Sequence, residues 1–511
     1  MRKFLNKYAA FAYVFLILYF VLHEFNANYG LVPVSMALKL FLRYLLIAAS
    51  LRFVSWFYFR NFKQSSFFTF ILMIFFLFFG AFHDTLKTAV KNPFFRSHTF
   101  IFLLIGLLSF VAIRVIKKYI KGNHVLFSFA AFVVSILFVW ELFYVLSNII
   151  FHKEKENNIV EAGLQHYRSG AGSGLQKPDI FFIVFDSYTS SECLLNDFDY
   201  SNQKLDSLLT SKGFFISRHS RSNYPLTPIS IASTLNMNYL KKDATPEESS
   251  AKHMLQGAIS VYDSELPLIL EKEGYRIYNY SVFDLRNHPA IIKPIFNYLA
   301  ERLIDEQTLL CRFNTYLLWN FTVKNLWTGK IHIPGSFFKQ REEYINNYIT
   351  REVTELGSVS EEQGSIPHFV YCHIMLPHKP YLFKANGNRQ PDSLLLDTSN
   401  PKGKFVEQTI YTNSMIEQIL DKLIRERKRP YVVILEGDHG FRDFANKKEK
   451  NKIFQNLNAY YFSDKQYDLL YDSMTPVNTF RVVLNKYFNQ HFNLLKDTSV
   501  YISDPSFNFE K

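Results

Sequence analysis

The sequence predicts a bundle of about five transmembrane helices followed by an α/β domain with a mostly parallel central sheet. Three observations lead to this prediction. The first 150 residues contain five long apolar stretches, and the residues after Pro178 alternate between short apolar runs and helical patterns. The charge is also divided unevenly: residues 1–150 hold 15 Lys and Arg against 3 Asp and Glu, whereas the remainder holds 42 of each.

The net charge of +12 therefore belongs to the apolar half of the chain. Basic residues that flank apolar spans are typical of the cytoplasmic loops of membrane proteins. The second half has no net positive charge with which to hold a polyanion. We therefore expect no nucleic-acid partner.

The apolar stretches lie at about 8–27, 31–58, 65–83, 98–116 and 124–150. Each is long enough to cross a hydrocarbon core roughly 30 Å thick, which takes about 20 helical residues. Lipid offers no hydrogen-bond partners to the backbone, so helices are expected. We assign residues 1–151 to a transmembrane domain and 152–177, which are polar and end in a Gly/Ser-rich run, to a flexible linker. Residues 178–511 then form one large domain.

The loops between the spans predict the topology. The N-terminus and the second and fourth connections hold nine basic residues: Arg2, Lys3, Lys7, Arg60, Lys63, Arg114, Lys117, Lys118 and Lys121. The other connections hold three: Lys87, Lys91 and Arg96. This bias favours a cytoplasmic N-terminus and, after five crossings, a second domain outside the cytoplasm.

Lys39 and Arg43 are unusual because they lie inside the second apolar stretch, on one helix face. Either this span begins at the interface and both side chains reach the head groups, or they contact a lipid phosphate near the outer leaflet.

Buried strands are predicted at Ile180–Phe185, Phe369–Cys372 and Tyr431–Leu435, because each is a short, continuous apolar run. Helical patterns lie around 201–212, 228–240, 264–273, 340–355, 405–427 and 475–488. Such alternation is typical of an α/β domain with a mostly parallel sheet.

The residues directly after these strands are carboxylates and imidazoles. Asp186 follows the first strand, His373 and His378 the second, and Asp438 and His439 the third. In an open parallel sheet, ligands bind beyond the carboxyl ends of the strands. One such Asp is often a helix cap and one His is often structural, but together they predict a metal site. Mixed oxygen and nitrogen ligands suit Zn²⁺ or Mn²⁺.

Residues 222–237, SNYPLTPISIASTLNM, offer a nucleophile. Pro228 suits the first position of a helix, which makes Thr227 the predicted N-cap. Capping is one role for its hydroxyl. The other is attack on a phosphoryl group gathered by the helix N-terminus, with metal coordination activating an otherwise poor nucleophile.

In this order, the strand ending in Asp186, the T-x-x-S at 227–230, the H-x-x-x-x-H at 373–378 and the D-H-G at 438–440 resemble the alkaline phosphatase/sulfatase superfamily. The likeness is closer to its membrane-anchored bacterial branch, the lipoteichoic acid synthase-like phosphoglycerol transferases and the lipid A phosphoethanolamine transferases. In that branch, five membrane helices carry an extracytoplasmic, sulfatase-like catalytic domain. The sequence lacks the C/S-x-P-x-R motif of true sulfatases, which argues against sulfatase activity.

The resemblance implies roles for individual residues. The metal ligands would be Asp186, Thr227, Asp438 and His439, with Thr227 as the nucleophile. His373 and His378 would lie on the substrate side, and we expect His378 to be the general acid. Arg442, two residues after the D-H-G where an acidic residue is common, is assigned to substrate binding. The first ligand is Asp where both transferase groups usually have Glu.

We thus expect a multi-pass protein of the bacterial cytoplasmic membrane that moves a phospholipid-derived phospho head group to an envelope glycan or lipid through a phospho-threonine intermediate. Two alternatives remain. The same site could use water as the acceptor, as in a phosphodiesterase or phosphatase, or it could be inactive in a protein that organises envelope assembly.

The predicted topology is tested by reporter fusions at Gly174. A reporter that is active only after export should be active there, and one that is active only in the cytoplasm should be silent, because nine basic residues hold the alternate loops inside. The opposite pattern would overturn the topology.

Overall fold

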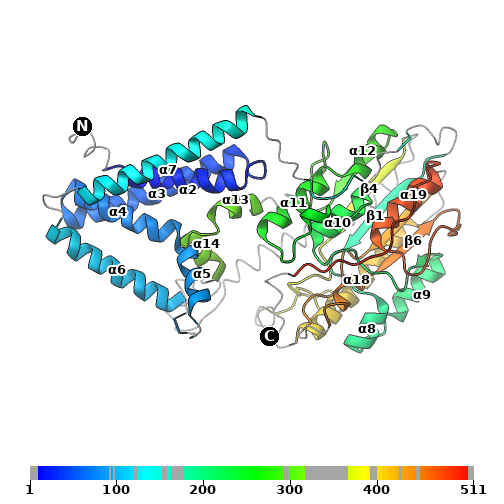
Figure 1. Ribbon diagram of the computed structural model, residues 1–511. Coiled ribbons are helices and arrows are strands. Elements are labelled where there is room, and N and C mark those ends of the chain that lie inside the picture. The colour runs from blue at the N-terminus through cyan, green and yellow to red at the C-terminus, as the bar shows by residue number, and fades with distance from the viewer. Residues whose placement is uncertain are drawn as a thin grey trace. The chain divides into compact units, whose positions relative to one another are not determined.

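The computed structural model describes residues 10–503, apart from residues 91, 93, 96–97, 120–124, 152–157, 163–166, 169–175, 292–297, 317–365, 392–399, 425–428 and 445–448. The chain divides into two compact units (Figure 1). Unit 1 comprises Met1–Glu156 with Asn297–Pro334, and unit 2 comprises Asn157–Phe296 with Gly335–Lys511.

Unit 1 is helical. Its helices are α2 (Ala12–Ala27), α3 (Val34–Phe59), α4 (Phe62–Leu77), α5 (Phe79–Ala89), α6 (His98–Tyr119), α7 (Val125–Ile150), α13 (Tyr298–Asp305) and α14 (Leu309–Tyr316). Within the described residues, three helices are long and apolar enough to cross a membrane: α3, α6 and α7. The prediction of about five spans is therefore corrected to three within the described residues, or to four if α4 and α5 count as one bent span.

The third predicted span is bent by 56° between α4 and α5. The backbone N–H of Gly80, in the first turn of α5, donates to the Gln307 carbonyl at 2.7 Å. A Cβ at Gly80 would lie 2.4 Å from Gln307 Oε1, the end of a flexible side chain that would have to move. The first predicted span corresponds to α2, which is apolar but has only 16 residues.

Helices α13 and α14 were not predicted, and they belong to the membrane unit although they lie far along the sequence. Helix α13 packs against α2 and α3, and α14 against α4 and α5. Arg43 Nη1 lies 2.5 Å from Glu301 Oε1 and 3.9 Å from Asp305 Oδ2, and Lys39 Nζ lies 3.9 Å from Glu301 Oε2. Lys39 and Arg43 thus face protein carboxylates, which neither interpretation of these two residues included.

Unit 2 contains a six-stranded sheet of order β2-β6-β5-β1-β4-β3. The strands are β1 (Asp179–Phe185), β2 (Phe215–Ile216), β3 (Arg276–Tyr280), β4 (His368–Ile374), β5 (Tyr431–Glu436) and β6 (Asn458–Phe462). Strands β3, β4, β1 and β5 are parallel, whereas β6 and β2 are antiparallel additions at one edge. The predicted α/β domain with a mostly parallel sheet is confirmed.

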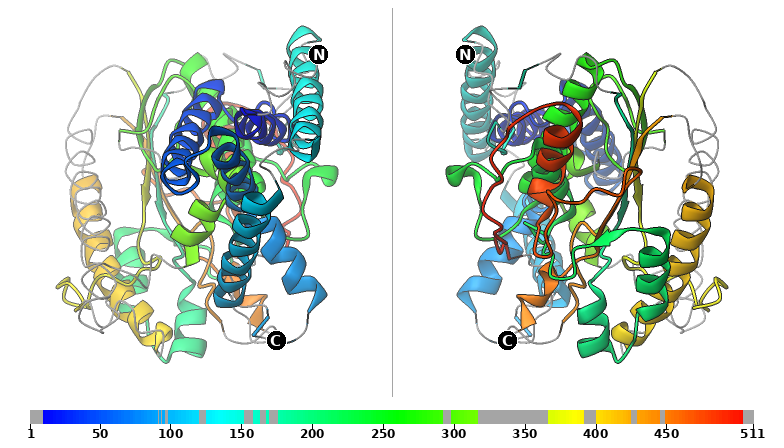
Figure 2. Two further views of the ribbon diagram at one scale, coloured as in Figure 1. Left: turned by 90° about the vertical axis from the view of Figure 1, so that its left-hand side faces the viewer. Right: turned by 90° about the vertical axis from the view of Figure 1, so that its right-hand side faces the viewer.

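Helices cover both faces of this sheet. They are α8 (Ser191–Phe198), α9 (Gln203–Lys212), α10 (Thr227–Asn236), α11 (Ala251–Tyr262), α12 (Glu265–Lys272), α18 (Pro401–Leu423) and α19 (Thr479–Tyr487). Figure 2 shows α18 on one face and α10 with α19 on the other. All residues of β1, β4 and β5 are buried, as their apolar runs predicted. Five predicted helices correspond to α9, α10, α12, α18 and α19, and the one at 340–355 lies outside the described residues.

Part of the predicted linker packs on unit 2. Ile159 and Val160 are buried, and the Ile159 carbonyl accepts a hydrogen bond of 2.8 Å from the Lys241 N–H. The Gly/Ser-rich run lies outside the described residues. Apolar residues at 159–160 thus anchor the segment that follows the last membrane helix.

We predict that the Arg43–Glu301 pair holds α13 on α3. Arg43→Glu or Glu301→Arg alone sets like charges against each other and should lower the melting temperature in nanodiscs. The double exchange should recover most of the loss, with a coupling of about 0.5–3 kcal/mol. Additive losses would show that the two side chains do not interact.

Candidate metal centre

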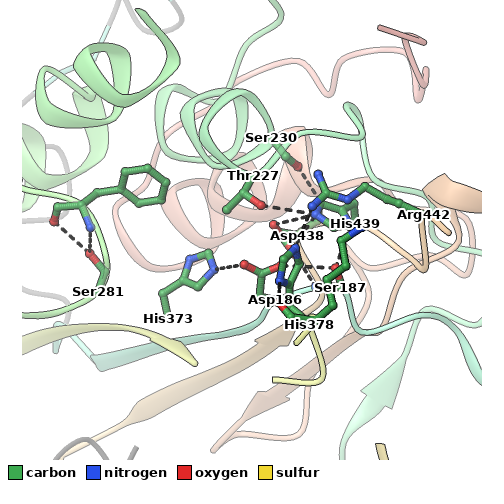
Figure 3. A network of polar contacts seen from close by, with 12 residues as sticks. Asp186, Ser187, Thr227, Ser230, Ser281, His373, His378, Asp438, His439 and Arg442 are labelled. Carbon is green, nitrogen blue, oxygen red and sulfur yellow. Dashed lines mark hydrogen bonds and ion pairs between the residues drawn. The ribbon is translucent and has the colours of Figure 1, made fainter. Parts of the chain in front are cut away.

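Three polar side chains meet beyond the carboxyl ends of β1 and β5 (Figure 3). Asp186 directly follows β1, and Asp438 and His439 lie in the turn after β5. One ligand atom from each lies within 4.8 Å of the others, and all three residues are buried. Thr227, the first residue of α10, completes the cluster, with its Oγ1 atom 3.3 Å from His439 Nε2.

The cluster fits a divalent metal ion. His439 Nε2 lies 3.4 Å from Asp438 Oδ2 and 3.7 Å from Asp186 Oδ1. Ligand atoms of a tetrahedral site with bonds of about 2.1 Å lie about 3.4 Å apart, so these spacings match. Asp438 Oδ2 is a buried atom that forms no hydrogen bond within the described part of the chain.

The orientation of His439 also suits a ligand. Its Nδ1 lies 2.8 Å from the Gly440 carbonyl, which can only accept, so Nδ1 carries the proton. Nε2 is thus left with a lone pair among Asp186, Asp438 and Thr227. Burial, and then the charge of Arg442, lowers the pKa of His439 well below its ordinary value, so the imidazole is neutral.

Close backbone contacts hold the turn that carries Asp438 and His439. A Cβ at Gly437 would lie 2.2 Å from the Tyr188 carbonyl oxygen, and one at Gly440 would lie 2.4 Å from the Gln455 carbonyl oxygen. Neither position has room for a larger residue. The glycines around Asp438-His439 therefore allow the turn to lie against its neighbours.

Two residues that sequence reasoning missed position this turn. The Ser187 N–H donates to Asp438 Oδ1 at 2.9 Å, and Ser187 adopts a left-handed conformation with φ of 65° to do so. Asn456 Nδ2 donates to the Gly437 carbonyl at 2.6 Å. Ser187 could have been suspected as the neighbour of Asp186, but no sequence signal marks Asn456.

The two carboxylates affect each other's ionisation. Burial raises the pKa of Asp438 to about 7, and the negative charge of Asp186 raises it as well. Burial also opposes ionisation of Asp186, but the neighbouring imidazoles of His378, His373 and His439, with a hydrogen bond from His373, hold its pKa well below the usual range. A proton or a cation is therefore needed to neutralise Asp438 at neutral pH.

Thr227 is not the N-cap that we predicted. Leu226 occupies that position with extended backbone and no side-chain cap, and Thr227 is the first residue of the helix. Its hydroxyl points at His439 rather than at its own backbone (Figure 3). Ser230, one turn further on, donates its hydroxyl to the Asp438 carbonyl at 2.6 Å. Thr227 therefore belongs to the ligand cluster, while Ser230 supports the turn.

His373 lies within β4, not after it, and is buried. Its Nε2 atom is 3.6 Å from Asp186 Oδ2, and its Nδ1 atom is 3.2 Å from the Tyr371 hydroxyl. The small pocket beside the cluster is lined by His378 and Arg442 but not by His373. This position favours a role in orienting Asp186 over the predicted contact with substrate.

His378 and Arg442 line that pocket together, as expected for the substrate side. Arg442 Nη2 lies 2.8 Å from His378 Nε2. Since a guanidinium can only donate, Nε2 must accept, and the proton lies on Nδ1, beside the Lys379 carbonyl. Burial lowers the pKa of His378 to about 4. The charge of Asp186 raises this pKa, whereas the charges of Arg442 and Lys379 lower it. In this arrangement His378 has no proton to give from Nε2, which the predicted general-acid role requires.

Glu436, the last residue of β5, is also buried near the cluster. Its Oε1 atom lies 3.4 Å from the Thr234 hydroxyl. Burial, and then the charge of Asp438, raises the pKa of Glu436 to about 8. Its raised pKa favours the neutral form at neutral pH, so Glu436 adds no further negative charge to the two carboxylates of the cluster.

Comparison with known proteins gives distant structural likenesses only. No protein-family model matches the chain, and no curated protein matches it. Solved structures that resemble it include a glycosaminoglycan 4S-sulfatase of Bacteroides thetaiotaomicron, with 14% identity, a TM-score of 0.37, and coverage of 61% of this chain and 72% of that one. The C-terminal periplasmic domain of EptC from Escherichia coli has 10% identity and a TM-score of 0.39, covering 67% and 93%. Its complex with Zn has 9% identity and a TM-score of 0.36, covering 62% and 83%.

With identities of 9–14% and TM-scores of 0.36–0.39, these likenesses assign no family or activity to this chain.

We predict that Asp438→Asn and His439→Ala each lose bound metal while the domain stays folded. Loss of one of four ligands weakens metal binding strongly, whereas the sheet does not depend on either side chain. Metal content per protein and thermal unfolding should be measured together. Asp472→Asn, a carboxylate elsewhere on unit 2 that pairs with His219, is the control and should retain metal. Full metal content in both ligand variants would show that the D-H-G is only a turn.

Metal affinity should depend on pH near neutrality. The pKa of Asp438 is raised to about 7, and a metal binds the ionised carboxylate, so affinity is fully present above that pH and is lost as the pH falls through it. Below about pH 7, one competing proton corresponds to about a tenfold loss per pH unit. Zinc titrations against a chelator would measure this dependence. A constant affinity from about pH 6 to about pH 8 would contradict it.

Proposed function

We propose that this protein is a membrane-bound, metal-dependent phosphotransferase with Thr227 as its nucleophile. The observation that carries the proposal is the position of the Thr227 hydroxyl, 3.3 Å from His439 Nε2 within the Asp186–Asp438–His439 cluster. A hydroxyl in that position is a ligand and a nucleophile at once. A divalent ion held there, zinc or manganese, would lower the pKa of the hydroxyl and offset charge on phosphoryl oxygens.

The start of α10 suits an anionic group. Thr227 is the first residue of α10, at the positive end of the helix dipole. A phosphoryl group that accepts the attack would lie against this end of the helix. Attack by Thr227 Oγ1 on phosphorus would form the phospho-threonine and break the bond to the oxygen of the leaving diacylglycerol.

Arg442 and His378 would serve the same step from the pocket side. A bound phosphoryl group would draw Arg442 away from His378 Nε2, because a guanidinium binds phosphate oxygens in preference to a neutral imidazole. The freed His378, next to an anion, would then gain a proton and could deliver it to the leaving oxygen. His378 is thus the proposed general acid, and it acts once Arg442 has moved away from its Nε2 atom.

The membrane unit gives the proposal its substrate class. Three described helices are long and apolar enough to span a bilayer, which anchors the chain where phospholipids are available. We propose that a phospholipid of the bacterial cytoplasmic membrane donates the phospho head group. An envelope glycan or lipid hydroxyl outside the cytoplasm would then attack the phospho-threonine and release Thr227.

Substitutions of Thr227 test the proposal. Thr227→Ala and Thr227→Asn should fold normally, because the hydroxyl does not cap its helix, and should be inactive because neither has a hydroxyl. Thr227→Ser should keep part of the activity. Mass spectrometry after incubation with vesicles of phosphatidylglycerol and phosphatidylethanolamine should find a phosphoryl adduct at position 227 in the native and Thr227→Ser proteins only.

The mass of that adduct would identify the head group. Ser233→Ala, in the same helix but bonded to the Asn238 carbonyl, is the matched control and should retain the adduct. Substantial turnover by Thr227→Asn would rule out the nucleophile. Head-group release that continues without any acceptor would favour the hydrolase alternative.

A further inference from the structure

One wall of the pocket beside the metal cluster is formed by the loop that follows β4, residues 375–383. Pro377, His378, Lys379 and Tyr381 of this loop all line the pocket. The proposed general acid thus lies on a loop and not on a regular element. Its position depends on whatever holds the backbone of that loop.

The side chain that holds this loop is Gln408 of α18, which is completely buried and belongs to neither the ligand cluster nor the pocket wall. Its Oε1 atom accepts from the Leu382 N–H at 2.7 Å and from the Phe383 N–H at 3.2 Å. Its Nε2 atom donates to the Pro377 carbonyl at 3.0 Å and to the His378 carbonyl at 2.9 Å. One side chain therefore ties the two ends of the loop together.

An amide is the group that matches these four partners. Its oxygen has two acceptor positions and its nitrogen has two N–H donors, while the loop offers two N–H groups and two carbonyls. A carboxylate in place of Gln408 could not donate to the carbonyls. An apolar side chain would leave all four backbone groups without this partner in the interior, which is costly. The hydrogen bonds of Gln408 are thus specific to its amide.

The anchored backbone decides which side chain moves when a phosphoryl group binds. In the proposed reaction, Arg442 has to leave His378 Nε2, which lies 2.8 Å from its Nη2 atom. Because Gln408 holds the His378 carbonyl, the imidazole stays at the pocket while the guanidinium turns toward the phosphoryl group. The general acid is therefore already in place when its Nε2 atom becomes free.

We infer that Gln408 is a positioning residue for His378, which it holds at the leaving oxygen without contacting substrate or metal. This inference rests on the proposed function, because it assigns Gln408 to the step in which His378 delivers a proton. It adds no chemical step to the reaction.

Substitutions of Gln408 test the inference with two kinds of leaving group. Gln408→Met removes all four hydrogen bonds with a side chain of similar length, and Gln408→Glu, which keeps an acceptor, is the second variant should the first not fold. In nanodiscs of phosphatidylglycerol and phosphatidylethanolamine, adduct formation at Thr227 should slow by about tenfold to a hundredfold, the loss expected from a misplaced catalytic group.

The second leaving group isolates the proton transfer. With p-nitrophenyl phosphodiesters of glycerol and of ethanolamine, assayed in detergent, the same variants should lose much less activity. The p-nitrophenolate ion leaves without a proton, so it does not need the general acid that Gln408 positions. A merely structural role of Gln408 would slow both reactions alike.

Thr409→Val is the matched control. Thr409 is the next residue of α18 and is equally buried, but its hydroxyl donates to the Phe405 carbonyl inside the helix at 2.8 Å. This variant should keep native rates with both leaving groups, and all variants should keep native zinc content. In a His378→Gln background, Gln408→Met should cost little more, because its effect passes through His378.

The outcomes separate this inference from the proposed function. Native rates of adduct formation in both Gln408 variants would overturn the inference. Equal losses with the two leaving groups, or losses that add to that of His378→Gln, would overturn it too, because Gln408 would then only support the fold. Absence of an adduct in the native protein would overturn the proposed function and this role with it. That failure is seen in the native chain, whereas a failure of the inference alone is seen only in the variants.

Discussion

The candidate site depends on two buried carboxylates that are held close together. Asp186 and Asp438 come from the ends of the adjacent parallel strands β1 and β5, and His439 lies between them. Two negative charges in a buried space repel each other, so the pair needs a proton or a cation. A divalent ion meets this need and can bind both oxygens, the neutral imidazole and the Thr227 hydroxyl. The same divalent ion would therefore serve the chemistry of the site and relieve the repulsion between its two carboxylates.

The backbone around this pair has little freedom. Gly437 and Gly440 approach the Tyr188 and Gln455 carbonyls too closely for a side chain, and Ser187 accepts a left-handed conformation to donate to Asp438. Asn456 adds a hydrogen bond to the Gly437 carbonyl. These contacts fix the ligand positions before any metal binds, which is the preorganisation that a catalytic metal site requires.

The membrane unit is built from two distant parts of the chain. Helices α13 and α14 follow β3 in sequence, yet they pack with α2–α5 and contribute Glu301 against Arg43. A charged residue inside an apolar membrane helix costs free energy unless an opposite charge pairs with it. The partner of Arg43, Glu301, is more than 250 residues away in the sequence. Helices α13 and α14 are thus an insertion between β3 and β4 in the sequence. The membrane helices can complete their packing only after the chain has passed through part of the sheet.

The sequence by itself determined the division into apolar and α/β halves, the three central strands, and the positions of Asp186, Thr227, Asp438 and His439. It could do so because buried parallel strands are continuous apolar runs and their carboxyl ends meet at one edge. The roles of these residues came from a resemblance of motifs. Only the tertiary structure decided what depends on contacts between distant segments. It moved Thr227 from cap to first helical residue, set His373 beside Asp186, and paired His378 Nε2 with Arg442. It also bent the third span between α4 and α5 and paired Glu301 with Arg43. Gly80 and Arg43 have their partners at 301–307, a segment in which the sequence predicted no helix.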